Sequence, residues 1–266
     1  MIWTFAKKIV LLQSETKTMK ENQFIHRISK EQIQTLPVVG FEGEVQVIDR
    51  PEQVEAAVAY LQTRRILGVD TEARPSFTRG VHYPTALVQV SSEERCYLFR
   101  LTHVGMPKEL CEVFANPQIC KVGLAFKDDL HGLRRRRNFE PKNCVDLQSI
   151  GIRYGILDMG LQKMFAICFG KKISKAQQLT NWENSHLTPE QARYASTDAW
   201  ATLMIYKELM KTQPLPKKEA EAIRRADLEK QQQHQQEVMA ARAAQMQQEG
   251  QGDTSSEQPA STANGQ

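Results

Sequence analysis

Apolar and polar residues alternate in blocks along the middle of the chain, and these blocks predict a succession of strands and helices. Short runs rich in Val, Ile and Leu, bounded by polar residues, are typical of buried strands. We assign strands to residues 45–48, 66–72, 86–90, 96–101, 119–123 and 144–147, with a hairpin turn at 91–95. Apolar residues repeated every three or four positions predict helices. These lie at 51–61, 107–115, from about 127, 148–154, 159–169 and 188–211. The alternation indicates an α/β domain.

The same pattern divides the 266 residues into three parts. Residues 1–43 are polar with no sustained period, so we expect an N-terminal extension, of which residues 1–18 precede a second start-like methionine, Met19. Residues 44–212 form the predicted domain. Residues 213–266 are rich in Lys, Glu, Gln and Ala. Their composition predicts a helix near 217–245 and disorder over about the last twenty residues.

Composition and charge narrow the function only slightly. The net charge of +4 is mildly basic, which permits a nucleic-acid partner without favouring one. No segment approaches the roughly 20 apolar residues of a membrane span, and Lys7 and Lys8 interrupt the apolar N-terminus, so we expect no membrane association. The five cysteines show no zinc-ligand spacing and suggest reduced thiols. We therefore expect a cytoplasmic protein.

The first candidate for chemistry is Asp70 with Glu72, at the end of a predicted strand. Side chains at positions i and i+2 of a strand share a face, so the two carboxylates project together. Two like charges so close are unfavourable unless a cation neutralises them, and paired carboxylates suit Mg²⁺ or Mn²⁺. The alternative is a strand end that meets solvent, with ordinary surface acids.

The second candidate is the pair Tyr194 and Asp198, four residues apart on the helix that begins near Thr188. Residues at this spacing share a helix face, and Ala201, Ile205 and Leu209 continue the same stripe. The pair is therefore expected to point inward. A buried aspartate needs a partner, so the pair marks either a Tyr–Asp hydrogen bond that fastens the helix or part of a site.

The third candidate is one of two neighbouring acids, Asp128 and Asp129, that follow the predicted Lys-Val-Gly strand. On a helix whose apolar face carries Phe126, Leu130 and Leu133, Asp129 lies within about 60° of that face. Asp128 points nearly the opposite way. We therefore favour Asp129, although the spacing leaves Asp128 as an alternative.

These three motifs, in this order, resemble those of the DEDD exonuclease superfamily over residues 44–212. The stretch NWENSHLTPEQARYASTDAW is similar to ribonuclease D and to the Werner-syndrome exonuclease domain. A histidine branch of the superfamily has His five residues before the last aspartate, where this chain has Arg193. A tyrosine branch, DEDDy, has Tyr four residues before it, which matches Tyr194.

The resemblance implies a ribonuclease H-like fold, with a mixed central sheet flanked by helices. It also implies two divalent cations, Mg²⁺ or Mn²⁺, held by four carboxylates. The reaction would be stepwise hydrolysis from the single-stranded 3′ end of DNA or RNA, with release of nucleoside 5′-monophosphates. The catalytic residues would be Asp70, Glu72, Asp129, Tyr194 and Asp198, and Tyr194 would orient the attacking water.

Residues that could contact nucleic acid lie near the motifs: Arg134, Lys171, Lys175, Trp182 and Phe77. Each has a structural alternative. The Arg134–Arg137 run could be a solvated helix end, and Trp182 could anchor its loop against the core. For the whole chain, the alternative functions are a non-catalytic nucleic-acid-binding module and an adaptor whose tail binds a partner.

Overall fold

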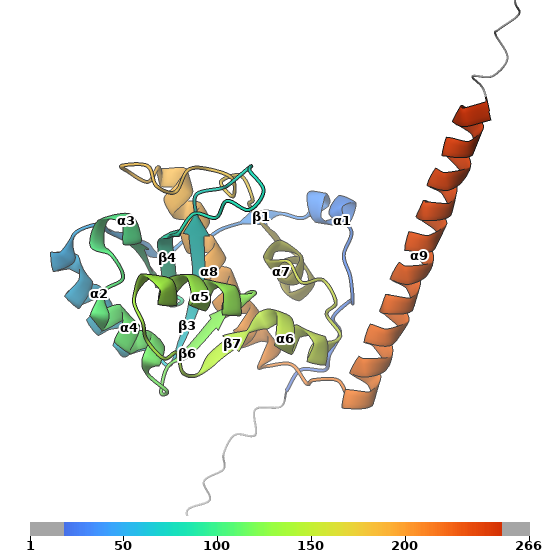
Figure 1. Ribbon diagram of the computed structural model, residues 1–266. Coiled ribbons are helices and arrows are strands. Elements are labelled where there is room, and N and C mark those ends of the chain that lie inside the picture. The colour runs from blue at the N-terminus through green and yellow to red at the C-terminus, as the bar shows by residue number, and fades with distance from the viewer. Residues whose placement is uncertain (1–18, 252–266) are drawn as a thin grey trace, which may run out of the picture. The chain divides into compact units, whose positions relative to one another are not determined.

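The computed structural model describes residues 19–251, and its central feature is a mixed sheet of six strands in the order β2-β5-β4-β3-β6-β7 (Figure 1). β4 is antiparallel to β3 and β5, and the other neighbouring strands are parallel. The strands are β2 (Glu44–Ile48), β3 (Ile66–Ala73), β4 (Thr85–Ser91), β5 (Arg95–Arg100), β6 (Cys120–Gly123) and β7 (Cys144–Asp146). The predicted hairpin is confirmed as the β4–β5 pair.

Helices cover both faces of this sheet. One face packs against α2 (Val54–Gln62), α4 (Lys108–Ala115) and α5 (Phe126–Arg136), and a core that includes Leu67 and Val69 fills the space between. The other face is crossed by α8 (Pro189–Leu209), accompanied by α6 (Leu147–Gly151) and α7 (Leu161–Phe169). The short helices are η1 (Pro51–Gln53), α3 (Leu101–Val104) and η2 (Ile152–Tyr154). The predicted α/β fold with a mixed, helix-flanked sheet is confirmed.

Gly68 sets how closely α8 approaches the sheet. A methyl group at Gly68 would lie 2.0 Å from the backbone oxygen of Ala199 and 2.8 Å from Oγ1 of Thr202. Only a residue without a side chain therefore allows β3 and α8 to pack at this distance. Because side chains alternate along a strand, Asp70 and Glu72 project toward the same face as Gly68. Gly68 thus brings α8 next to the two acids.

The segment before β2 contains structure that the sequence pattern did not predict. Helix α1 (Lys30–Thr35) begins at a capping box, in which Ser29 and Gln32 each bond the backbone N–H of the other. Strand β1 (Val38–Val39) then pairs in parallel with β8 (Lys172–Ile173), a short strand after α7. Asp158 anchors the segment, because it accepts a hydrogen bond from the Ile28 backbone N–H at 2.8 Å. The segment is therefore fastened on both sides of α7, to Asp158 before the helix and to β8 after it.

Residues after Pro216 form a separate unit, in which α9 (Lys217–Gln251) is the described element. The helix continues beyond its expected end near residue 245. The disorder expected at the end of the chain falls largely on residues 252–266. The residues that precede Met19 are 1–18. Both ranges lie outside the described residues. Among the helices of residues 19–251, none is both long and apolar enough to cross a membrane.

Candidate active site

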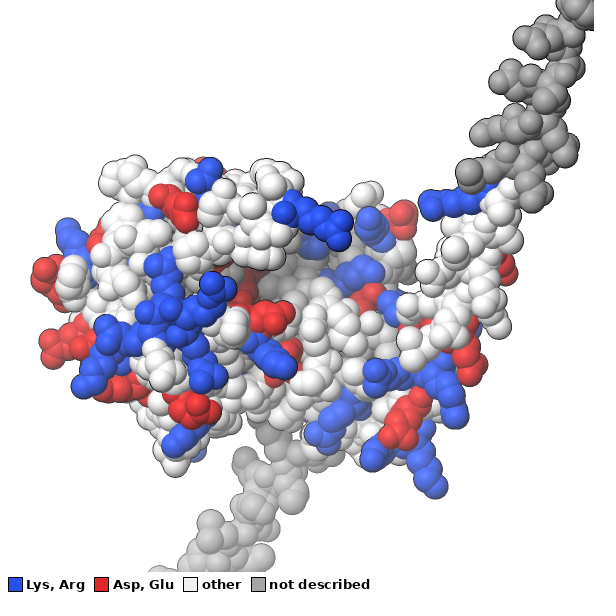
Figure 2. All heavy atoms as spheres, viewed as in Figure 1, with Lys and Arg blue, Asp and Glu red and all other residues white. Residues whose placement is uncertain are grey.

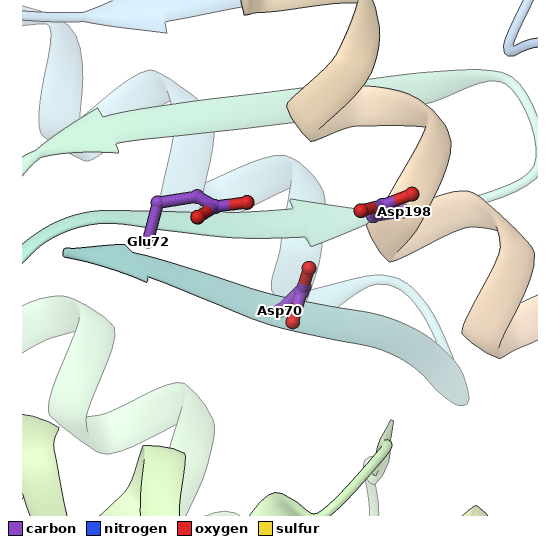
Figure 3. A group of neighbouring side chains, drawn as sticks. All are labelled: Asp70, Glu72 and Asp198. Carbon is purple, nitrogen blue, oxygen red and sulfur yellow. The ribbon is translucent and has the colours of Figure 1, made fainter. Parts of the chain in front are cut away.

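Three carboxylates meet where β3 passes under α8. Asp70 and Glu72 extend from β3 and Asp198 extends from α8, and all three point into the same space (Figure 3). One oxygen from each residue lies within 4.8 Å of the others. The geometry of β3 places Asp70 and Glu72, and the geometry of α8 places Asp198, so that the three carboxylates lie close together.

The sequence of α8 explains how Asp198 reaches this place. Thr188 and Gln191 form a capping box and Pro189 occupies the first turn, so the start of the helix is fixed. Ala195 and Ala199, on the side that meets the sheet, are fully buried and small enough for close packing. Asp198 is itself buried, with 7% of its surface exposed. The helix therefore carries a carboxylate into a region where an unpaired charge is costly.

Burial and mutual repulsion change the acidity of the whole group. Burial, followed by the charges of Asp198, Glu72 and Asp129, raises the pKa of Asp70 well above its usual range. Burial and the charges of Asp198 and Asp129 raise the pKa of Glu72 to about 9. Burial raises the pKa of Asp198 to about 7, although its contact with Tyr194 and the positive charge of Lys175 lower it. The three carboxylates therefore bind protons more tightly than ordinary acids do, and a bound cation would relieve their repulsion.

One carboxylate oxygen of the cluster shows that a cation would fit there. Oδ1 of Asp198 is buried and has no hydrogen-bond partner within the part of the chain that the structure describes. A buried carboxylate oxygen without a donor is unfavourable, and oxygen-rich carboxylate sites are those that Mg²⁺ and Mn²⁺ prefer. The free oxygen and the three converging carboxylates fit a divalent cation.

Tyr194 lies beside Asp198 on the same face of α8, as the sequence predicts. Burial, followed by the charges of Asp198 and Glu72, raises the pKa of the Tyr194 hydroxyl above its ordinary value. The hydroxyl therefore keeps its proton at neutral pH. The Tyr194 ring packs against that of Trp182, with 5.9 Å between the ring centroids. The hydroxyl is thus a positioned hydrogen-bonding group at the edge of the acidic cluster.

Asp129 lies on the opposite side of β3 from α8. Its Oδ1 accepts a hydrogen bond of 2.5 Å from Oγ1 of Thr71, the residue between the two acids of β3. Burial, and then the charges of Asp128 and Asp146, raise the pKa of Asp129 to about 7. Asp129 raises the pKa of Asp70 and Glu72 in turn, so it lies near them, although it is not among the three clustered acids. Asp128 is exposed.

Polar contacts hold the helix that carries Asp129. Ala125, just before α5, adopts a left-handed conformation with φ 52°. Residues other than glycine rarely take this conformation. Asp146 at the end of β7 stabilises this turn, because its carboxylate accepts hydrogen bonds from the backbone N–H groups of Ala125 and Phe126, at 3.1 and 3.0 Å. Asp146 thereby fixes the start of α5 and the position of Asp129.

A cavity of about 300 Å³ opens beside the acids. Asp70, Glu72, Tyr194 and Asp198 line it, together with one basic residue, Lys175, whose charge acts on Asp198. Its polar side chains also include Gln162, Ser174 and Gln178. Figure 2 shows acidic side chains in a hollow of this face, with basic side chains on either side. The arrangement could hold a small anionic group between cations and lysine.

Comparison with known proteins now identifies the domain. The family model described as a 3′-5′ exonuclease matches residues 45–213. The chain belongs to this exonuclease family. The predicted resemblance is thus confirmed.

Two curated relatives show how far this exonuclease domain extends into longer proteins. The chain is 32% identical over 154 residues to exonuclease 3′-5′ domain-containing protein 2 of Drosophila melanogaster, covering 56% of this chain and 26% of that protein. It is 29% identical over 150 residues to the bifunctional 3′-5′ exonuclease/ATP-dependent helicase WRN of Mus musculus, covering 54% of this chain and 11% of that protein. The chain therefore matches only a small part of either relative.

A solved structure confirms the fold. The RNase D of Escherichia coli, described as an exoribonuclease involved in structured RNA processing, superposes with a TM-score of 0.58 at 23% identity. The match covers 63% of this chain and 44% of that one. At this identity the likeness establishes the shared exonuclease fold, which is the ribonuclease H-like fold that the sequence predicts.

The residues predicted to contact nucleic acid occupy different environments in this exonuclease domain. Lys175 lines the acidic cavity, whereas Lys171 lines a separate aromatic cavity with Phe165 and Trp200. Arg134 is exposed near the end of α5, 3.7 Å from Glu140. Phe77 is 86% exposed in the segment after β3.

The structure corrects the prediction for Trp182. Its ring is fully buried and packs on Tyr194, so it has no free face on which a base could stack. The structural alternative, an anchor for the loop before α8, is the role that the structure gives it. Phe77 is the exposed aromatic residue of the predicted set.

Sequence reasoning missed two residues that position the exonuclease acids. Thr71 holds Asp129, and Asp146 holds the turn before α5. A signal was available for Asp146, because an aspartate that ends a strand and precedes a helix is a typical N-cap, and it also accepts from the Gln148 backbone N–H. Thr71 gave no signal beyond its place between two acids.

Proposed function

We propose that this protein is a metal-dependent 3′→5′ exonuclease that hydrolyses phosphodiester bonds and releases nucleoside 5′-monophosphates. One observation carries the proposal. Two partly buried carboxylates of β3 converge with the buried carboxylate of Asp198 on α8, and one oxygen of Asp198 has no hydrogen-bond partner among the described residues. Such a group suits divalent cations, and a family of 3′-5′ exonucleases provides the reaction class.

Asp70, Glu72 and Asp198 would hold the cations, with Asp129 nearby on the α5 side. Mg²⁺ and Mn²⁺ fit best, because every candidate ligand is a carboxylate oxygen. Two such ions would neutralise the acids and stabilise negative charge on the attacking and leaving oxygens of the phosphodiester. The carboxylates, held by β3 and α8, would keep the cations in place before the substrate binds.

Tyr194 would orient the attacking water. Its raised pKa keeps the phenol protonated, so it acts as a hydrogen-bonding group and not as a base. Lys175, which lines the same cavity as the acids, would contact a phosphate oxygen. The cavity of about 300 Å³ has the size of a site for one small molecule, which favours an unpaired 3′-terminal nucleotide over a duplex end.

The test uses single-stranded oligonucleotides labelled at either end, incubated with Mn²⁺. The 5′-labelled strand should shorten one nucleotide at a time, and the 3′-labelled strand should release a labelled mononucleotide at once. The Asp70→Asn variant should abolish both products. Tyr194→Phe should slow turnover while titration calorimetry shows Mn²⁺ bound as in the wild type. Bound Mn²⁺ without shortening of either strand would refute the enzyme and favour a non-catalytic binding module.

A further inference from the structure

A second cavity adjoins the candidate active site. It has a volume of about 470 Å³, and it shares Gln162, Ile173, Ser174 and Lys175 with the acidic cavity. Lys30, Lys163, Lys172 and Lys175 line it, and no Asp or Glu is among the described residues of its wall. The acidic cavity therefore adjoins a basic one, which we call the lysine groove.

The four lysines differ in how their charges are used. Nζ of Lys163 pairs with the buried Asp158 at 2.8 Å, and Nζ of Lys172 donates to the backbone oxygen of Gln34 at 2.5 Å. Lys30 and Lys175 are exposed, and neither forms an ion pair with any residue in the described range 19–251. The lysine groove thus offers at least two unpaired cations, one beside the acids and one at a distance from them.

The rest of the lining suits a nucleotide. Ile33, Val38 and Ile173 provide apolar surface, and Val38 is 63% exposed although apolar. Gln34 and Gln162 add side-chain amides that can donate and accept hydrogen bonds. Cations that follow a backbone, combined with apolar surface for the bases, are what single-stranded nucleic-acid sites generally use.

One wall of the lysine groove is built by the segment before β2. Lys30, Ile33 and Gln34 lie in α1, and Val38 lies in β1. These residues precede residue 45, where the family match begins. The wall is firmly held, because β1 pairs with β8, Leu157 N–H donates to the His26 oxygen at 2.9 Å, and Ile33 packs in a small core with Ile28 and Ala166.

The arginines at the end of α5 and at its C-cap are the competing basic surface, and most of them already have a partner. Arg134 lies 3.7 Å from Glu140, Arg136 donates to the Leu101 backbone oxygen, and Arg137 donates to the Met106 backbone oxygen. They line neither the acidic cavity nor the lysine groove. Position and free charge both favour the lysine groove.

We propose that the lysine groove binds the sugar-phosphate backbone of the nucleotides that precede the 3′-terminal one, with Lys30 as a phosphate contact remote from the cut. This inference rests on the proposed function, because it takes the acidic cavity as the place of the terminal nucleotide. It makes the segment 29–39 a part of the substrate site and assigns the chain a single-stranded substrate of several nucleotides.

The first measurement is length discrimination. The value of kcat/KM is determined for a dinucleotide and for single-stranded decanucleotides of deoxythymidine and of uridine. Lys30→Glu should lower the ratio of decanucleotide to dinucleotide kcat/KM by about tenfold, because only the longer strand reaches the lysine groove. Lys142→Glu is the matched control, because it makes the same charge change at an exposed residue that has no ion pair within residues 19–251. Arg134→Glu tests the competing surface.

The second measurement does not depend on hydrolysis. Fluorescence anisotropy gives the Kd of each labelled decanucleotide for the Asp70→Asn protein, alone and combined with Lys30→Glu, over a range of salt concentrations. Loss of one phosphate contact should reduce the slope of log Kd against log salt by about 0.7. Lys30-dependent binding without hydrolysis by the wild type would support the lysine groove and refute the exonuclease.

Two results would overturn the lysine groove while leaving the exonuclease intact. One is unchanged length discrimination and unchanged Kd in Lys30→Glu. The other is a loss caused by Arg134→Glu and not by Lys30→Glu, which would place the strand along α5.

Discussion

The two sides of the acidic site are held in place by different kinds of interaction. On the α8 side, Asp198 is positioned by close packing of the helix on the sheet, because Gly68 allows the Ala199 backbone to lie against β3. On the α5 side, Asp129 is positioned by polar contacts, through Thr71 and through the turn that Asp146 stabilises. Close-packed interiors transmit strain when an atom is added, whereas a single hydrogen bond contributes only about 1 kcal/mol net. The α8 side should therefore tolerate change least.

The largest effect should come from Gly68→Ala. The added methyl group would overlap the Ala199 oxygen, so α8 must move away from β3. We expect a loss of about 3 kcal/mol in the free energy of unfolding, or roughly 10 °C in Tm. Displacement of Asp198 by about 1 Å should also reduce kcat by roughly a hundredfold. Thermal denaturation followed by circular dichroism, together with oligonucleotide assays, measures both.

Gly160→Ala is the control for the loss of stability, because a methyl group there meets no atom of residues 19–251 within 4 Å. As the N-cap of α7 it should cost less than about 1 kcal/mol. Equal destabilisation by the two substitutions would mean that the close approach of α8 is not what Gly68 provides.

The next effect concerns charge and pH in the metal-free protein. The pKa is about 9 for Glu72 and about 7 for Asp129 and Asp198, against about 4 in an unfolded chain. An acid with a raised folded pKa binds its proton more tightly when folded, so the folded state loses stability as the pH rises between these values. We therefore expect these groups to lower the Tm of the metal-free protein as the pH rises from 5 to 8.

Asp198→Asn isolates this effect, since it removes a charge with little change in shape. Without metal at pH 8 the variant should melt a few degrees above the wild type. Each kcal/mol gained in the free energy of unfolding raises the Tm by about 2–4 °C. At pH 5 the difference should disappear, because Asp198 is then protonated. Mn²⁺ should raise the Tm of the wild type more than that of the variant. A variant less stable than the wild type at both pH values would show that repulsion in the cluster is unimportant.

A smaller effect should come from Thr71→Val on the α5 side. The change keeps the shape of the side chain and removes the hydroxyl that donates to Asp129. Groups that orient a metal ligand typically affect metal affinity or activity by about 10–100-fold, and we expect the lower end of that range here. Thr71→Ser retains the donor and should restore most of the activity. If both variants behave like the wild type, Asp129 does not depend on Thr71.

The smallest effect should be a gain in stability from Ala125→Gly. The left-handed conformation costs alanine about 1 kcal/mol or more and costs glycine little. We expect a Tm higher by roughly 2–4 °C with activity close to that of the wild type. Ala59→Gly, on the exposed face of α2, should have the opposite sign, with a loss of about 1 kcal/mol. Destabilisation by Ala125→Gly would contradict a strained turn.

The α8 side of the site could be predicted from sequence because it depends on local periodicity. The spacing of two residues in β3 and of four in α8 fixed the direction of each acid, and the predicted stripe of Ala201, Ile205 and Leu209 is fully buried. The hairpin and the order of strands and helices followed from the same patterns. Each of these features repeats over several residues, so the signal is strong.

Helix periodicity predicted Asp129, but the contacts that hold it and the wall of the lysine groove could not be predicted, for physical reasons. Thr71 meets Asp129 across 58 positions of sequence, and a lone threonine carries no pattern. β1 and β8 are two residues long, too short for an alternation. Trp182 lies in a loop without periodicity, where its burial depends on the tertiary fold. Interactions between single residues far apart in sequence therefore became visible only in three dimensions.

The pairing of β1 with β8 has a practical consequence for work on this domain. A fragment that starts at residue 45, where the family match begins, would lack β1 and α1 and leave the backbone of Lys172 and Ile173 open along that edge. Such a fragment would keep the acidic residues. On our proposal, however, it would no longer bind the nucleotides that precede the 3′-terminal one. It should then act distributively, with the substrate released after each nucleotide, whereas the chain that retains residues 29–39 should degrade several nucleotides per encounter.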